Sequence, residues 1–466
     1  MTNTASPTRS YARLFLCLLL WLIVANFIAV IYSAHWLRPG ADDYCLAWVT
    51  AERGVIGSVI SSWESINGYL TSVFYGSLWV GWPLAHLPLS LASALPFILA
   101  ALGIGFSVNT LLSSIVQLRK FAYCVVLVVS AYLWWSFFWV QTLLSLSGEG
   151  ATSFIGNSML QMGSGLAHWQ TLNGQHVLQM CSLIIFGGLI LRHSAQHSNA
   201  RLLLILGFGF IAGMMGPTLA VSLMVFAVLA GWVFTKKDYT FSRAELMGFV
   251  VSILVGLIFT QFFSPGIHKR QALLGTKFDL TFMGGIDLLD EAFRFALQYW
   301  LNGFLSYGGV TIFSVVVGLV YGLGLKPRFG GQDRAWLFGA LFGLFSLLQI
   351  FINRAAETFA YHGYWHFISA IVCTYLSLVF FGIAAGIKLE TMDVNRKLQG
   401  FVFFVLLLGV LLGISSNVAM MKSMYARQTI WSGGPASVLG VTDIDIKWVD
   451  NCWDHLNTLR PHQIER

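Results

Sequence analysis

The sequence contains few charged residues. Only 10% of its 466 residues are Asp, Glu, Lys or Arg, whereas 57% are hydrophobic. A soluble globular domain carries roughly a quarter charged residues and could not hide this much apolar side chain from water. The composition therefore excludes an ordinary water-soluble protein.

The six cysteines also lack the spacing of a metal or redox motif. None of them forms a CxxC or CxxH pair, so neither a zinc cluster nor a thioredoxin-like centre is expected, and most are expected to be small packing residues. Cys45 and Cys452 are both expected outside the membrane, where an oxidising compartment would permit a disulfide between them.

The positive net charge of +7 is spread along the chain. The basic residues form no stripe interleaved with exposed aromatic residues, so nucleic-acid binding is not expected. They lie in short segments between apolar runs, the pattern that orients a membrane protein with its basic loops in the cytoplasm. Acidic residues are almost absent from the apolar runs, which argues against a proton-relay pump or an ion-coupled carrier.

Apolar runs of about twenty residues recur along the chain, and in lipid each must be helical to satisfy its backbone polar groups. They predict an all-α polytopic membrane protein with about eleven transmembrane helices in a membrane-embedded domain over residues 1–420. The expected helices cover residues 14–34, 89–116, 121–140, 175–192, 202–217, 219–235, 244–263, 297–325, 335–352, 366–388 and 398–420.

The first apolar run follows Arg9 and Arg13 and lacks a cleavage site, which predicts a retained anchor with a cytoplasmic N-terminus. Placing the later basic segments in the cytoplasm leaves four outer loops and a non-cytoplasmic tail: 35–88, 141–174, 264–296, 353–365 and 421–466.

Residues 54–88 in the first outer loop are predicted to contain an amphipathic helix lying in the membrane interface. Apolar residues recur at helical spacing from Val55 to Leu70, and Trp79 and Trp82 would anchor the continuation near the headgroups.

Three GxxxG spacings occur in the later apolar runs. They involve Gly318 and Gly322, Gly339 and Gly343, and Gly382 and Gly386. Small residues at this spacing let two membrane helices approach closely, so these glycines are interpreted as packing positions.

Two adjacent carboxylates, Asp42 and Asp43, precede Tyr44 directly after the first membrane helix. Adjacent acids in a confined place repel, so one could act as a base, or both could hold a divalent cation such as Mg²⁺ or Mn²⁺. The alternative is a solvated acidic turn.

A basic cluster follows the seventh expected helix, where Ser264-Pro265-Gly266 leads to His268, Lys269 and Arg270. A turn followed by three cationic side chains at the interface suits a lipid phosphate or pyrophosphate. Attraction to ordinary headgroups is the alternative.

A third cluster lies between the ninth and tenth helices, with Arg354, Glu357 and His366 among aromatic residues. Arg can bind a phosphate through two hydrogen bonds, and Glu or His can transfer a proton. Alternatively, Glu357 pairs with Arg354 and the aromatic residues form an interface belt.

Together these elements resemble the C-type membrane glycosyltransferases, in particular a bacterial group with a DDY motif in its first outer loop. The sequence differs at Tyr69, where relatives often have Arg after Asn-Gly, and at Ile267, where they have Asn after Pro-Gly. The matching residues span most of the chain: Ala41-Asp42-Asp43-Tyr44, Trp63 to Gly68, Ser264-Pro265-Gly266 followed by Arg270, and Arg354.

The resemblance implies a GT-C-like fold and a polyprenyl-phosphate sugar donor, with a cell-surface glycan or a lipid-linked molecule as acceptor. The protein would lie among the lipids of a bacterial inner membrane and act on its periplasmic side. Asp42 or Asp43 would serve the transfer. The expected substrate-binding residues are Tyr44, His268, Lys269, Arg270, Arg354, Glu357 and His366.

Two other functions are compatible with the sequence. A transporter or flippase of lipid-linked glycans would also have many helices and basic headgroup contacts, but it should show broken helices or charges near the midplane. An inactive relative acting as a membrane scaffold is the third alternative, because the Asn-Gly-Arg arginine is replaced by Tyr69.

Overall fold

A computed structural model describes the helical core of the protein. The described residues are 7–37, 42–65, 69–115, 173–192, 199–236, 242–266, 268–269, 282–306, 314–319, 322, 331–357, 368–391 and part of 401–425. Nearly all of them are helical, which confirms the prediction of an all-α protein.

Among the described residues, five helices are long and apolar enough to cross a membrane. They cover Cys17–Trp36, Leu89–Leu111, Arg243–Phe262, Ala335–Asn353 and Val372–Leu389. Three shorter apolar helices cover Gly174–Leu189, Asn199–Gly213 and Pro217–Leu229. All eight coincide with predicted spans, so the chain is a membrane-embedded helical protein. The predicted span 121–140 lies outside the described residues.

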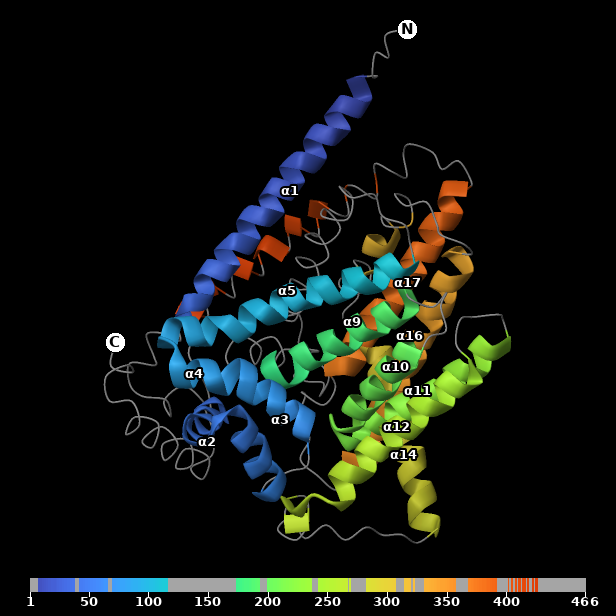
Figure 1. Ribbon diagram of the computed structural model, residues 1–466. Coiled ribbons are helices and arrows are strands. Elements are labelled where there is room, and N and C mark those ends of the chain that lie inside the picture. The colour runs from blue at the N-terminus through green and yellow to red at the C-terminus, as the bar shows by residue number, and fades with distance from the viewer. Residues whose placement is uncertain are drawn as a thin grey trace.

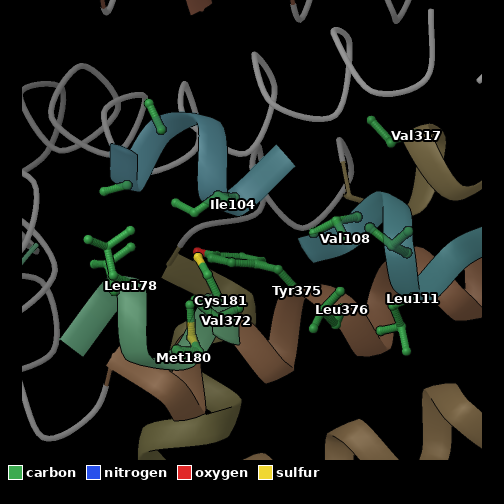
Figure 2. Packing of buried hydrophobic residues seen from close by; sticks show 14 of the residues in the cluster. Ile104, Val108, Leu111, Leu178, Met180, Cys181, Val317, Val372, Tyr375 and Leu376 are labelled. Atoms are coloured by element: carbon green, nitrogen blue, oxygen red, sulfur yellow. The ribbon is translucent and has the colours of Figure 1, made fainter. Parts of the chain in front are cut away.

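The hydrophobic core lies where α5 (Leu89–Ile115), α9 (Gln179–Arg192) and α17 (Ile368–Thr391) meet. Figure 2 shows the side chains of Ile104 and Cys181 in this region, with the ring of Tyr375 extending toward Cys181. α16 (Gly331–Glu357) packs along α17, where Phe342 and Phe380 stack with ring centroids 5.6 Å apart.

A second group of helices, α10 (Asn199–Gly213), α11 (Pro217–Lys236) and α12 (Arg243–Phe262), lies on the other side of α9 (Figure 1). α12 begins with a capping box, in which the Ser242 hydroxyl accepts from the Glu245 backbone N–H and the Glu245 carboxylate accepts from the Ser242 backbone N–H. Both N–H groups would otherwise lack a helical partner.

The GxxxG glycines pack as predicted. A Cβ atom on Gly318 would meet the backbone of Val379, and one on Gly386 would meet the backbone of Leu319, so residues 314–322 and α17 touch through their glycines. Gly339 contacts the Phe381 ring instead, and its carbonyl accepts a 2.6 Å hydrogen bond from Ser377.

α1 (Pro7–Ser33) lies at the edge of the molecule, and its N-terminal end extends away from the other helices (Figure 1). The final helical residues, 401–425, run beside it. Asn417 donates a 2.6 Å hydrogen bond to Asn26, and the rings of Trp36 and Tyr425 meet edge to face at 5.4 Å. The first and last helices of the membrane domain are therefore neighbours.

One predicted boundary differs from the structure. α14 covers Phe282–Ser306, so this helix begins within the segment expected as the outer loop 264–296 and well before the expected start of the span at 297. Of the rest of that expected span, the structure describes residues 314–319 and 322. The charged residues Asp290 and Arg294 interrupt the apolar run, although the helical period continues through them. α16 covers Gly331–Glu357, and its apolar part, Ala335–Asn353, agrees with the span expected at 335–352.

Candidate functional site

The acidic motif opens helix α2 (Asp42–Ser65). Carboxylates at this position are stabilised by the positive end of the helix dipole. Asp43 and Tyr44 are 0% and 1% exposed, and Tyr44 packs in a cluster with Val80 and Leu84. Only the backbone of Asp42 lies within the described residues. The structure therefore places Asp43 and Tyr44 in a packed interior rather than on an open surface.

Cys45 is disulfide-bonded. The described free cysteines are Cys17, Cys181 and Cys373, and the partner of Cys45 lies outside the described residues. The predicted pairing with Cys452 therefore stays a prediction.

α2 bends at Gly54, whose φ of 69° and ψ of 176° are not helical. A residue with a Cβ atom would be strained there, so the glycine permits the bend. Arg53 spans the bend, because its guanidinium donates a 3.2 Å hydrogen bond to Ser61. Beyond the bend, Ile56 and Ile60 are 63% and 50% exposed at i,i+4 spacing, as expected for a helix that lies in the interface.

The chain then folds back along α2 through α3 (Leu70–Gly76), the π-helix η2 (Ser77–Gly81) and α4 (Trp82–His86). The buried hydroxyl of Ser77 donates a 3.0 Å hydrogen bond to that of Ser58. The predicted amphipathic segment 54–88 is thus a helical hairpin, defined here as the cap, rather than a single helix.

A second π-helix, η4 (Asn173–Leu178), abuts the first. A Cβ atom on Gly174 would come within 2.8 Å of Val80, and one on Gly76 would come within 2.7 Å of Gln175. π-Helical turns are rare and occur frequently at functional sites. Two of them in contact mark the cap as a candidate functional region.

Polar side chains of α3 attach the cap to the membrane helices. The Ser72 hydroxyl lies 2.9 Å from the Met215 carbonyl and 3.1 Å from Oε1 of Gln179, and Thr71 donates a 3.2 Å hydrogen bond to the Ile211 carbonyl. The cap is therefore fixed on the turn between α10 and α11 and on the start of α9.

The structure brings the predicted basic cluster to the end of α2. Ser264 donates a 2.9 Å hydrogen bond to the Trp63 carbonyl, and the ammonium group of Lys269 donates a 3.1 Å bond to the Glu64 carbonyl. His268 lies 3.1 Å from the Phe262 carbonyl. His268 and Lys269 are both exposed, so they remain accessible to an anion. Arg270 lies outside the described residues.

The third predicted cluster is described only in part. Arg354 and Glu357 lie in the last turn of α16, with their side chains outside the described residues, as is the whole of His366. The preceding Asn353 is fully buried. Within the described parts of the chain, no group of three or more His, Cys, Asp or Glu residues could hold a metal ion.

Among α9, α10, α11, α12, α16 and α17 lies a cavity of about 270 Å³. Its lining is almost wholly apolar and includes Met180, Gly187, Phe208, Ala227 and Phe342. Glu245 lies at the wall, and its carboxylate is 3.3 Å from the Arg201 guanidinium in an ion pair in which both side chains are buried.

Sequence reasoning missed the cavity, the two π-helices and this buried ion pair. The S-x-x-E pattern of Ser242 and Glu245 is a capping-box signature, which indicates the start of α12. The partner Arg201 lies 44 positions earlier and could be found only from the packing of α10 against α12.

Comparisons of the chain with protein-family models, curated proteins and solved structures found no match.

Proposed function

We propose that this protein is a membrane glycosyltransferase that moves a sugar from a polyprenyl-phosphate donor to a cell-surface glycan or a lipid-linked acceptor. The observation that carries the proposal is the attachment of the basic loop to α2. One helix begins with the acidic motif Asp42-Asp43, and its other end binds Ser264 and Lys269. α2 therefore connects the acidic motif at its first turn with the anion-binding loop at its last turn.

Sugar transfer needs both the acidic motif and the basic loop. The donor's phosphate becomes the leaving group, and cations beside it stabilise the charge that develops. Lys269 and His268 are exposed and available for this role, with Arg270 and Arg354 as further expected contacts. The polyprenyl tail keeps the donor in the bilayer, while the acceptor approaches from the aqueous side.

A carboxylate of the acidic motif removes a proton from the acceptor hydroxyl. The acceptor hydroxyl transfers its proton to a carboxylate and attacks the anomeric carbon, whose bond to the phosphate oxygen breaks, and polyprenyl phosphate departs with the electron pair. Asp43 is fully buried, which favours Asp42 as the group that meets the acceptor. A divalent Mg²⁺ or Mn²⁺ ion at the acidic pair would supply electrostatic stabilisation of the leaving group.

We place the cap on the periplasmic side of a bacterial inner membrane, with the N-terminus in the cytoplasm and the tail 421–466 outside. The disulfide at Cys45 supports this orientation, because disulfides persist in the periplasm and are rare in the cytosol.

The test is transfer of a labelled sugar from polyprenyl-phosphate donors in membranes that contain matched amounts of wild type, Asp42→Asn, Asp43→Asn or Lys269→Ala. We expect Asp42→Asn to lower transfer by at least 100-fold, in the range of lost acid-base catalysis. Glu52→Gln is the matched control, since Glu52 is an exposed carboxylate on the same helix. Full activity of both aspartate variants would contradict the assignment of the acid.

A flippase of lipid-linked glycans is the second candidate, favoured by the apolar cavity among the membrane helices. Proteoliposomes that translocate a lipid-linked glycan without transferring its sugar to any acceptor would support this function and overturn the transferase.

A further inference from the structure

The cavity among α9, α10, α11, α12, α16 and α17 has the size of a ligand site. Its volume of about 270 Å³ exceeds that of an engineered apolar cavity of roughly 150 Å³ that stays dry and binds benzene. A void of this size deprives the side chains around it of dispersion contacts. An apolar group that fills the cavity would restore these contacts.

Water does not suit this space. A buried water needs two to four polar partners, and the lining is apolar apart from the wall at Glu245. The Glu245 carboxylate is already engaged by the Ser242 backbone N–H at 2.8 Å and by Arg201 at 3.3 Å. In a membrane, the acyl chains of the surrounding lipids can fill such a space.

The charges at the end of the bundle where α12 begins indicate the headgroup. Arg243 is exposed at the first position of α12, within the same first turn as Glu245. Lys236 ends α11, and Lys237 follows it in the chain. Basic residues at the end of a membrane helix attract anionic lipids.

We propose that the cavity binds one acyl chain of an anionic phospholipid, whose phosphate lies at the end of the bundle where Arg243 begins α12. This lipid holds α11 against α9, α10 and α16 as a structural component of the bundle. The inference is independent of the proposed sugar transfer, because it concerns a different part of the molecule and a different ligand.

Two glycines, one on α9 and one on α10, offer a clean test. Gly187 on α9 lines the cavity, and a Cβ atom there would have no heavy atom within 4 Å, so Gly187→Leu is expected to place its side chain in the cavity. Gly207→Leu on α10 is the matched control. Gly207 is also free of neighbours within 4 Å, but it is exposed and does not line the cavity.

The full chain is purified in detergent and analysed by native mass spectrometry, and its melting temperature is measured with and without added phosphatidylglycerol. Wild type and Gly207→Leu are expected to retain one phospholipid and to melt at higher temperature when it is added. Gly187→Leu is expected to retain at least tenfold less phospholipid than wild type. Its melting temperature should not rise when phosphatidylglycerol is added. Ala227→Phe fills the cavity from α11 and provides a second variant should Gly187→Leu not fold.

Phosphatidylethanolamine and a polyprenyl phosphate are the comparison ligands. Displacement of the retained lipid by polyprenyl phosphate at lower concentration than by phosphatidylglycerol would overturn the phospholipid assignment. Equal lipid retention by wild type and both cavity-filling variants would overturn the site itself. Lipid retention and sugar transfer are measured separately. Sugar transfer without lipid retention would overturn only the lipid site, and lipid retention without sugar transfer would overturn only the proposed reaction.

Discussion

Replacing Arg201 by Met is expected to destabilise the helical bundle by about 3 to 5 kcal/mol, the cost of removing one partner from a buried ion pair. The Arg201 and Glu245 side chains are only 4% and 6% exposed, and their nearest atoms lie 3.3 Å apart. In the variant, Glu245 would keep the hydrogen bond from the Ser242 backbone N–H but would lose its compensating charge inside the bundle.

Glu245→Gln should have a similar cost, because it leaves the guanidinium buried without its counter-ion. A Gln at this position still completes the capping box, so the start of α12 is preserved and the effect reports the charge. The double variant Arg201→Met/Glu245→Gln should recover most of the loss, since replacing both members of a buried pair is often nearly neutral.

Unfolding free energies are measured in mixed micelles with increasing denaturing detergent. Arg294→Met is the control, because Arg294 forms a 2.8 Å pair with Asp290 in which the side chains are 78% and 54% exposed. Exposed pairs of this kind contribute about 0 to 1 kcal/mol. A loss below about 1 kcal/mol for Arg201→Met, or strictly additive losses in the double variant, would refute the reasoning.

Three further results are expected. Gly213→Leu should destabilise by at least about 1 to 3 kcal/mol, because its side chain would enter the backbone of α12 at Ile253, whereas Gly207→Leu should be nearly neutral in the same unfolding titration. Asn26→Leu should cost about 0.6 to 2 kcal/mol by removing the hydrogen bond to Asn417, with Asn26→Gln as the polar control. Peptide mapping without reductant should find Cys45 linked to Cys452, and a different partner would contradict the pairing.

The apolar periodicity of the sequence was sufficient to predict most membrane helices, because in lipid a long apolar run has one stable conformation. The spans expected at 202–217 and 219–235 correspond to α10 and α11, but the structure ends α10 at Gly213 and begins α11 at Pro217, where proline is compatible with the first turn of a helix. The start of α14 was placed too late, at 297 instead of Phe282, since its charged residues lower the average hydropathy while leaving the helical period intact.

The candidate site was predictable only as separate motifs. The sequence indicated Asp42-Asp43 and the basic cluster at 264–270, but their connection depends on the bend at Gly54 and on hydrogen bonds to the carbonyls of Trp63 and Glu64. Backbone carbonyls carry no sequence signal. The burial of Asp43 and the packing of Tyr44 against Val80 and Leu84 likewise depend on the fold of the returning hairpin and carry no local sequence signal.

The neighbouring glycines of α9 show why a small-residue pattern does not by itself define a helix contact. A Cβ atom on Gly188 would lie 3.1 Å from the backbone of Thr110 and Leu111, so this glycine permits the close approach of α5. Gly187, one position earlier, faces the cavity and has no such neighbour. Because successive helical residues point about 100° apart, one of the two glycines brings helices together and the other leaves the space that a lipid chain can fill.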